Sequence, residues 1–182
     1  MQKEDRRTKI TKQMLKQSLL ELLKTDSIHH IKIRELCEHA DVNRSTFYKY
    51  YASQYELLQD MENDWLRSME HYLGSITPDQ EAFFADMLVS LEENLELSRL
   101  LLNSNVDADF PRKLFERPYI KQRIDEVIPL ANKDDSEVEY VYRFYVNGGY
   151  SIIKHWLNKE QREPTEEIAR IMQHIFKNIQ YK

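Results

Sequence analysis

Glycine is the scarcest informative residue in this chain. Only 3 of the 182 residues are glycine, at positions 74, 148 and 149, whereas soluble proteins average about 7%. β-Turns and phosphate-binding loops both depend on glycine, because it adopts backbone conformations that other residues avoid. The shortage argues against a β-rich fold or a Gly-rich nucleotide site, and it predicts an almost wholly helical chain.

Cysteine and long apolar runs are also missing. Cys37 is the one cysteine, which excludes an intramolecular disulfide and a Cys-rich zinc site and fits a reducing compartment. The first residues, 1–13, are charged where a signal peptide is apolar, and no stretch approaches the roughly 18 apolar residues of a membrane helix. We therefore expect a cytoplasmic protein with no membrane partner.

The sequence offers little support for a metal site or an enzyme. The six histidines, at 29, 30, 39, 71, 155 and 174, form no i, i+4 pair and have no partner cysteines, so we expect no metal and no cofactor. Cys37 is interpreted as a small buried hydrophobe. There is no Gly-x-Ser-x-Gly motif and no nucleophile beside a base, so a catalytic function is not expected.

Charge is distributed unevenly along the chain. The net charge is −5 overall, but residues 1–55 carry 11 Lys and Arg against 7 Asp and Glu, a net charge of +4, which leaves −9 for the remainder. A basic end joined to an acidic body is expected where only one end meets phosphates.

Apolar periodicity predicts the helices. Steps of three and four place Ile10, Met14, Leu15, Leu19, Leu22 and Leu23 on one stripe, and Leu58, Met61, Trp65, Met69 and Tyr72 on another. Between these two helices we expect short helices at about 33–40 and 44–51, and a longer one from residue 54. Further helical stretches are predicted at about 79–92, 94–104, 110–127 with a break near Pro118, 135–158 and 165–180.

The two short central helices have the form of a helix-turn-helix. They are separated at residues 40–43, where Asp41 tolerates a left-handed turn and Asn43 is a good N-cap. Such a pair lays its second helix into the DNA major groove. Arg44, Ser45 and Thr46 in the first turn are then expected to reach base edges, and Tyr48 and Lys49 to reach phosphates.

Residues 31–58, IKIRELCEHADVNRSTFYKYYASQYELL, resemble the DNA-binding signature of the TetR/AcrR family of transcriptional regulators. The resemblance implies an all-α fold, with an N-terminal three-helix DNA-binding domain at 1–53 and a C-terminal helical bundle for dimerisation and ligand binding at 54–182. It also implies a DNA-contacting set that comprises Lys32, Arg34, Asn43, Arg44, Ser45, Thr46, Tyr48, Lys49, Tyr50 and Gln54.

Three positions depart from the family pattern. Asp41 stands where the turn usually has glycine, Lys32 stands where Thr or Ser often begins the second helix, and Gln54 replaces a usual lysine of the fourth helix. The third change predicts that one phosphate contact is weaker or absent.

The C-terminal part matches less specifically. Residues 144–157, FYVNGGYSIIKHWL, resemble the penultimate helix of a subgroup common in Gram-positive bacteria (Firmicutes). Taken together, the TetR/AcrR resemblance implies a repressor that binds palindromic operator DNA as a homodimer and responds to an unknown small-molecule effector. An alternative is a TetR-like co-activator controlled by a protein partner.

Two further sets of residues are predicted in the C-terminal part. Met and aromatic residues suggest an apolar effector cavity, with Tyr140 and Asn147 as polar anchors; its set is Trp65, Met69, Phe84, Met87, Phe115, Tyr140, Phe144 and Asn147. A surplus of apolar surface on the last two helices predicts the dimer interface, for which Gly148 and Gly149 would permit close helix approach; its set is Ile153, Trp156, Leu157, Ile168, Ile171, Met172, Ile175 and Phe176.

Overall fold

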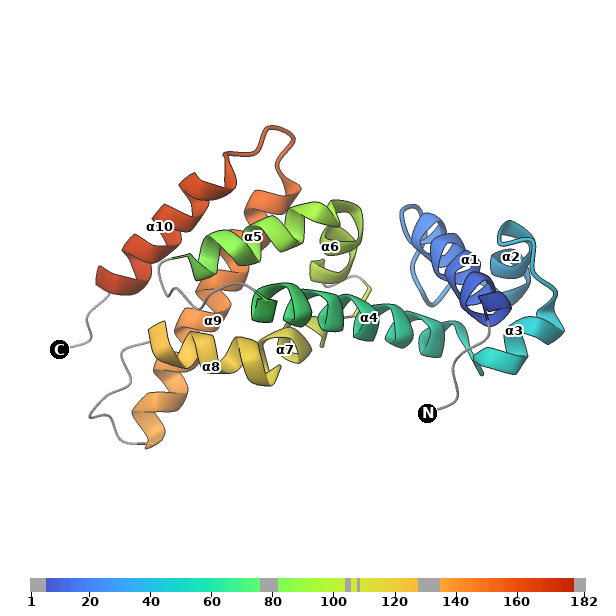
Figure 1. Cartoon of the computed structure of the whole chain (residues 1–182), viewed down its shortest axis with the longest axis horizontal. Coiled ribbons are helices and arrows are strands. Elements are labelled where there is room, and N and C mark those ends of the chain that lie inside the picture. The colour runs from blue at the N-terminus through green and yellow to red at the C-terminus, as the bar shows by residue number, and fades with distance from the viewer. Residues whose placement is uncertain (1–5, 76–81, 104–105, 108, 128–134, 179–182) are drawn as a thin grey trace. The chain divides into compact units, whose positions relative to one another are not determined.

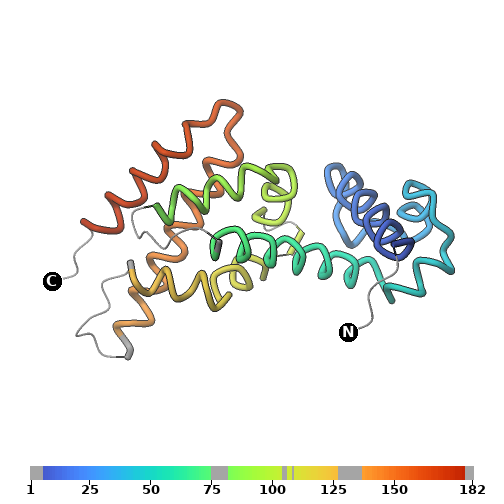
Figure 2. The backbone as a smooth tube through the Cα atoms, in the orientation of Figure 1, coloured from blue at the N-terminus to red at the C-terminus, as the bar shows by residue number. Residues whose placement is uncertain are grey.

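The computed structural model describes residues 6–75, 82–103, 106–107, 109–127 and 135–178. Within these ranges the chain forms ten α-helices and no β-strand (Figure 1, Figure 2). None of the helices in these ranges combines the length and apolar composition that crossing a bilayer requires. The predicted all-helical fold is confirmed.

The helices begin and end close to the predicted positions. In chain order they are α1 (Arg6–Leu22), α2 (Ile33–His39), α3 (Arg44–Tyr50), α4 (Gln54–Ser75), α5 (Phe83–Glu93), α6 (Leu95–Leu102), α7 (Phe110–Phe115), α8 (Pro118–Val127), α9 (Asp135–Asn158) and α10 (Thr165–Asn178). The predicted break near Pro118 separates α7 from α8, because proline suits a first helical turn better than a helix interior. The predicted helix ends at 79–81, 104 and 179–180 lie outside the described residues.

The chain packs as two compact units. Unit 1 is Met1–Trp65 and unit 2 is Leu66–Lys182, so the division falls inside α4. The boundary inferred from the sequence, between residues 53 and 54, separates functions rather than packing units, and it stays a prediction.

Unit 1 has a core to which all four of its helices contribute. Leu19 from α1, Leu36 from α2, Phe47 from α3 and Leu57 from α4 are fully buried, and side chains of this size each stabilise a fold by roughly 1.5–3 kcal/mol when buried. The hydroxyl of Ser18 donates a buried 2.9 Å hydrogen bond to the Leu36 carbonyl, which ties α1 to α2. The short helices α2 and α3 thus rest on the longer ones.

The apolar stripe predicted for α1 is wrong at its first two positions. Ile10 is 48% exposed and Met14 is 40% exposed, whereas Leu15 and Leu19 are buried. The short helix α2 has only seven residues and meets α1 at Ser18, beyond Met14 in the chain. The first turns of α1 therefore keep part of their apolar surface in solvent.

A Schellman motif ends α2 and turns the chain into α3. The Asp41 amide donates to the Glu38 carbonyl at 3.3 Å, and the Val42 amide donates to the Cys37 carbonyl at 3.0 Å. This motif needs a left-handed residue between those bonds, and Asp41 has a φ of 51°. The predicted left-handed turn at Asp41 is confirmed.

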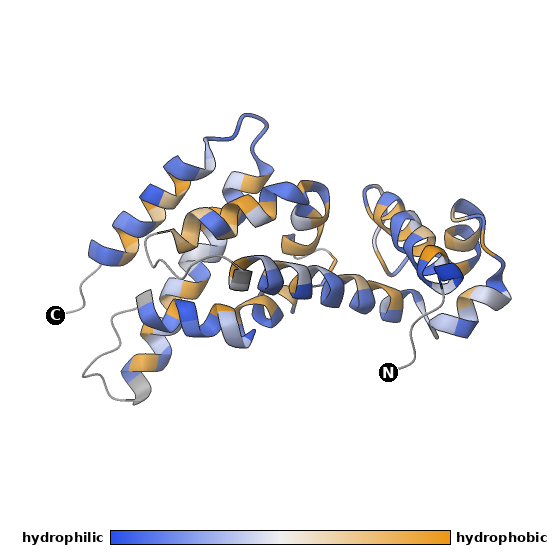
Figure 3. Ribbon diagram, viewed as in Figure 1, coloured by the Kyte–Doolittle hydropathy of each residue, from blue (hydrophilic) through white to orange (hydrophobic). Residues whose placement is uncertain are grey.

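Unit 2 is centred on an aromatic cluster that joins α5, α9 and α10. The Phe176 ring centroid lies 4.9 Å from that of Phe84 and 4.9 Å from that of Tyr145. A Cβ atom added at Gly149 would lie 3.3 Å from Phe176. Gly149 is thus explained by the approach of α10 from the same chain, whereas an added Cβ at Gly148 would meet nothing within 4 Å. Hydrophobic and hydrophilic bands alternate along α10, as expected of a helix with one buried face (Figure 3).

Tyrosine hydroxyls bind backbone carbonyls near the C-terminal ends of helices in unit 2. Tyr150 donates to the Leu102 carbonyl of α6 at 2.5 Å, and Tyr119 donates to the Leu73 carbonyl of α4 at 2.9 Å. The last carbonyls of a helix lack partners within the helix, and many proteins end the helix with a glycine that lets other bonds satisfy them. Burial raises the pKa of Tyr150, which keeps its hydroxyl protonated as a donor. In a chain so poor in glycine, long-range tyrosines take part of that capping role.

Candidate nucleic-acid interface

The N-terminus of α3 is fixed by Asn43. Its side-chain oxygen accepts hydrogen bonds from the Ser45 amide and the Ser45 hydroxyl, each at 2.9 Å, which confirms the predicted N-cap. Arg44 and Ser45 are exposed on the first turn, and Thr46 is half-buried. The first turn of α3 therefore has a defined position and an accessible outer side.

The inner face of α3 holds the helix against unit 1. Phe47 is fully buried, and its ring centroid lies 5.9 Å from that of Tyr51. The Tyr51 hydroxyl donates to the Asp60 carboxylate of α4 at 2.7 Å. Phe47 therefore faces inward, and these contacts restrain the middle and the C-terminal end of the short helix.

The outer face of α3 carries polar and aromatic side chains. Tyr48 and Lys49 are exposed, and the Lys49 ammonium lies 5.5 Å from the centroid of the Tyr50 ring. Tyr50 is half-buried because its hydroxyl reaches within 3.3 Å of the Thr8 hydroxyl in α1. Tyr50 therefore links α3 to α1 and presents only part of its surface.

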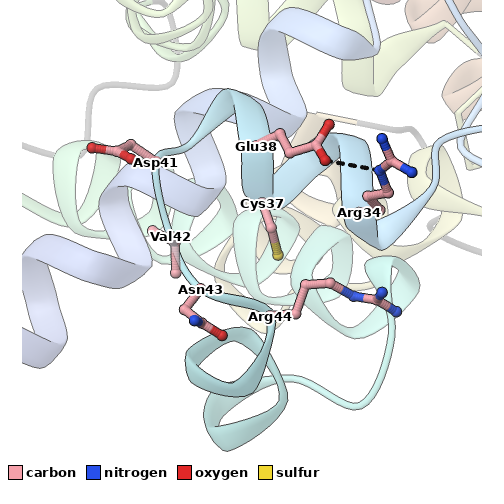
Figure 4. A pocket seen from close by; sticks show the side chains of 7 residues that line it. All are labelled: Arg34, Cys37, Glu38, Asp41, Val42, Asn43 and Arg44. Atoms are coloured by element: carbon pink, nitrogen blue, oxygen red, sulfur yellow. Dashed lines mark hydrogen bonds and ion pairs between the residues drawn. The ribbon is translucent and has the colours of Figure 1, made fainter.

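Two hollows flank α3 in unit 1. The first, of about 530 Å³, lies between α2 and α3 (Figure 4) and is lined by Arg34, Cys37, Glu38, Asp41, Val42, Asn43 and Arg44. The second, of about 830 Å³, extends to the loop before α2 and is lined by Asp26, His29, His30, Ile31, Lys32, Ile33, Arg34, Arg44, Tyr48 and Gln54. Of the predicted DNA contacts, Lys32, Arg34, Arg44, Tyr48 and Gln54 come together in the second hollow. Ser45, Thr46, Lys49 and Tyr50 line neither of these two.

Arg34 has a competing partner that sequence reasoning missed. Its Nε donates to the Glu38 carboxylate at 2.8 Å, and both side chains are exposed (Figure 4). The spacing of four residues along α2 was a visible signal for this ion pair. Glu38 adds negative charge to a hollow that three residues of the predicted DNA-contacting set, Arg34, Asn43 and Arg44, also line.

Cys37 belongs to α2 and is buried. Figure 4 shows its sulfur pointing from α2 toward α3. Burial raises the pKa of the Cys37 thiol, an effect that the nearby Arg44 charge partly opposes. The thiol is therefore a poor nucleophile at neutral pH, and its interpretation as a small buried hydrophobe is confirmed.

The residues predicted to line an effector cavity do not share one environment. Trp65, Met69, Phe84, Met87 and Phe115 are at most 6% exposed. Tyr140 and Phe144 on α9 are 74% and 59% exposed, and Asn147 is also exposed. An interior cavity cannot be lined by all eight side chains, because three of them lie at the surface.

Most residues predicted for the dimer interface are buried in unit 2 itself. Ile153, Trp156, Leu157, Ile168, Met172 and Phe176 are each at most 7% exposed within the single chain. Among the predicted set, Ile171 is exposed and Ile175 is half-buried. A second copy could contact these two, while the other six already pack inside the subunit.

Comparison with known proteins identifies the family. The family model for a transcriptional regulator C-terminal region of TetR type matches residues 79–178. The chain is 22% identical over 165 residues to the uncharacterized HTH-type transcriptional regulator YxbF of Bacillus subtilis. That alignment covers 86% of this chain and 42% of YxbF, so the chain spans less than half the length of this relative.

Solved structures share the fold. A TetR transcriptional regulator from Streptococcus agalactiae superposes with a TM-score of 0.74 at 22% identity, covering 95% of this chain and 97% of that protein. The dihydroxyacetone kinase operon activator DhaS gives 0.57 at 15% identity, with 91% and 93% covered. A TetR-family regulator from Streptomyces coelicolor gives 0.56 at 18% identity, with 91% and 80% covered. With the family match over more than half of its length, the chain belongs to the TetR family, whose members are DNA-binding transcriptional regulators and not enzymes.

Proposed function

We propose that this protein regulates transcription in the cytoplasm by reading a palindromic operator as a homodimer, with α3 as the recognition helix. The proposal rests on how α3 is held in unit 1. Its N-terminus is capped by Asn43, its inner face is anchored by Phe47, and Arg44 is exposed on its first turn. Residues at the start of such a helix reach base edges when it enters the major groove.

Phosphate contacts flank this helix in the proposed complex. Lys32 and Gln54 lie at the first turns of α2 and α4, and they line one hollow together with Tyr48. Groups on either side of a recognition helix fix its depth and register by binding the two sugar-phosphate backbones. Lys49, exposed on the last turn of α3, adds a further cation.

The proposed homodimer uses the outer side of α9 and α10 rather than their buried side. Tyr145 and Gly149 of α9 meet Phe176 of α10. When two helices pack antiparallel, the residue one position before a contact residue points to the same side of the pair in both helices. That side carries Tyr140, Phe144 and Gly148 from α9 and Ile171 and Ile175 from α10.

An exposed stripe with two aromatic rings at its centre is typical of a protein interface, because burying it removes a large apolar area from water. Gly148 has open space beside it, which permits a close approach by a helix from a second copy. A twofold axis here would give the pair of recognition helices that a palindrome requires, about 34–36 Å apart.

Sedimentation of two matched variants tests this interface. Phe144→Glu places a charge in the proposed apolar contact, so we expect monomers and loss of operator binding with unchanged helix content. Gln122→Glu adds the same charge at an exposed position on α8, and it should remain dimeric. A Phe144→Glu protein that stays dimeric and binds DNA normally contradicts the proposed surface. Ile175→Glu checks the α10 side in the same assay.

Selection of bound duplexes from a random pool tests the DNA-binding function. We expect enrichment of an inverted repeat whose half-sites are about one helical turn apart. Binding should weaken steeply with added salt, since each neutralised phosphate releases counterions. Failure to enrich any sequence under low-salt conditions contradicts the proposal.

For regulation we propose a repressor that is released by a small-molecule effector, with control by a protein partner as the alternative. The Met and aromatic residues of unit 2, such as Met69 and Met87, supply the apolar lining that effector pockets use. DhaS is named as an activator of a dihydroxyacetone kinase operon and has the same fold. The fold is therefore compatible with activation as well as repression.

Mass spectrometry of the purified protein distinguishes the two modes of regulation. A small molecule that is retained through purification and released on denaturation, and that weakens operator binding when added back, supports the repressor. A protein that co-elutes in fixed ratio and changes operator binding when added back supports the alternative.

A further inference from the structure

Two adjacent histidines lie in the loop that joins α1 to α2. His29 and His30 are both exposed, and both line the second hollow with Lys32, Arg44 and Gln54. The hollow thus contains side chains from the loop and from the starts of α2, α3 and α4. Three of these neighbours belong to the DNA-contacting set, whereas neither histidine does.

His29 is held in place by Tyr55 in the first turn of α4. Its Nδ1 atom lies 2.9 Å from the Tyr55 hydroxyl, and the two ring centroids are 5.8 Å apart. Because Nδ1 is engaged, Nε2 is the ring nitrogen that remains for another partner. A tyrosine that fixes one nitrogen of a histidine also fixes the direction of the other.

The charged groups around His29 favour an anion. Lys32 and Arg34 approach from α2 and Arg44 from α3, while Tyr48 and Gln54 add polar side chains. The carboxylates nearby have partners: Asp26 binds His30 Nδ1 at 3.1 Å and the Ser27 amide at 2.8 Å, and Glu38 binds Arg34.

We propose that His29 is a phosphate-binding residue of the DNA interface, oriented by Tyr55, and that its contribution grows as the pH falls. The inference rests on the proposed DNA-binding function, and the ligand is a backbone phosphate of duplex DNA.

The hydrogen bond between His29 and Tyr55 explains why protonation has a double effect. With a neutral ring that accepts at Nδ1, the Tyr55 hydroxyl proton is used in that bond, and only Nε2–H is left to donate. With a protonated ring, Nδ1–H donates to the Tyr55 oxygen, which releases the hydroxyl proton for another acceptor. The protonated pair therefore offers a positive charge and a second donor, and a phosphate accepts both.

Histidine changes its charge between about pH 5 and pH 8, so the test compares DNA affinity at about pH 6 and about pH 8 at fixed ionic strength. Phosphate contacts are independent of base sequence, and the probe is a fluorescently labelled random-sequence duplex of roughly three helical turns. We expect wild-type binding to be roughly threefold to tenfold tighter at the lower pH, the size of one ordinary protein hydrogen bond.

Four variants assign the effect. His29→Gln should lose most of the pH dependence while its affinity at about pH 8 changes little. Tyr55→Phe should reduce the dependence, since the ring loses its orienting partner. His39→Gln is the matched control, because His39 is exposed at the end of α2 and lines neither hollow, and it should keep the full dependence. His30→Gln measures how much of the pH dependence comes from His30, which pairs with Asp26.

The outcomes separate the inference from the function on which it rests. A wild-type protein that binds the duplex equally at both pH values, or a His29→Gln variant that keeps the whole pH dependence, overturns the inference and leaves DNA binding intact. Absence of binding at both pH values in low salt overturns the proposed function itself.

Discussion

The Lys16 ammonium of α1 lies 2.7 Å from the Asp60 carboxylate of α4, and Asp60 also accepts a hydrogen bond from Tyr51 at the end of α3. Burial by itself would raise the pKa of Asp60, but the bonds from Lys16 and Tyr51 outweigh it and lower that pKa below its ordinary value of 3.8. One carboxylate therefore links three helices of unit 1 in its ionised form.

The first prediction concerns this carboxylate. Because the folded-state pKa of Asp60 is depressed, its stabilisation is present above 3.8 and is lost as the pH falls through the folded-state value. Asp60→Asn should lower the free energy of unfolding at neutral pH by about 1–2 kcal/mol and should flatten the loss of stability in acid. Urea unfolding at pH values on both sides of 3.8 measures both effects. A variant with the same acid profile as the wild type would contradict the assignment.

The second prediction concerns the C-terminal end of α9. Arg99 of α6 donates from Nε to the Leu157 carbonyl at 2.5 Å and from Nη2 to the Lys159 carbonyl at 3.2 Å. Arg99→Met removes donors from half-buried carbonyls, which should cost about 1–3 kcal/mol and lower the thermal midpoint by roughly 2–4 °C per kcal/mol.

Arg112→Met is the matched control for Arg99→Met. Arg112 is exposed and, among the described residues, pairs with the surface carboxylates of Asp109 and Glu116, so the change should stay within about 0.5 kcal/mol. Equal midpoints for the two variants would mean that the carbonyl contacts of Arg99 do not stabilise unit 2.

The third prediction concerns Glu38. Its hydrogen bond engages Arg34, a cation of the predicted DNA-contacting set, and its own negative charge repels a phosphate that approaches this hollow. Glu38→Gln should raise affinity for random duplexes severalfold and should reduce the ratio of specific to non-specific binding, because the added attraction is independent of sequence. Glu35→Gln, at an exposed position on the same helix that lines neither hollow, should change affinity less. The idea is wrong if both variants bind random DNA alike.

The fourth prediction concerns the cap of α3. Asn43→Ala removes the acceptor of the Ser45 amide, with an expected cost of roughly 0.5–2 kcal/mol and weaker operator binding, because the first turn of α3 frays. Asn43→Ser restores a capping oxygen and should recover most of the stability. Circular dichroism melts and DNA titrations on the same samples measure the two effects, and a failure of serine to rescue either one would show that capping is not the role of Asn43.

Local patterns were sufficient to predict the helices of this protein. Asn43 as an N-cap, Asp41 as a left-handed residue and the helix break near Pro118 each depend on a few neighbouring residues, and the structure confirms all three. The resemblance of residues 31–58 to one family added the placement of α3, since the motif is long and its polar and buried positions are distinct.

Periodicity did not reveal which partner covers each apolar face. Trp156 and Met172 belong to the apolar surface that predicted a dimer interface, yet they are buried within their own subunit. Phe144 belongs to the set predicted to line an effector cavity, yet it is exposed. Both situations produce the same sequence pattern, because a helix face is apolar whether it packs within one chain or against another.

Long-range polar contacts were equally inaccessible to sequence reasoning. Tyr150 binds a carbonyl in α6, and His29 binds Tyr55 in α4. Such bonds join elements far apart in the chain, and their partners are backbone groups or side chains that no local spacing identifies.

The most direct test of the central claim compares Arg44→Ala with Lys49→Ala on a selected operator and on a random duplex. If α3 reads bases, Arg44→Ala should cost about 1–3 kcal/mol on the operator and little on the random duplex, with relaxed preference at one base pair. Lys49→Ala should weaken binding to both duplexes and reduce the salt slope by about one unit. Equal losses on both duplexes for Arg44→Ala would contradict α3 as the recognition helix.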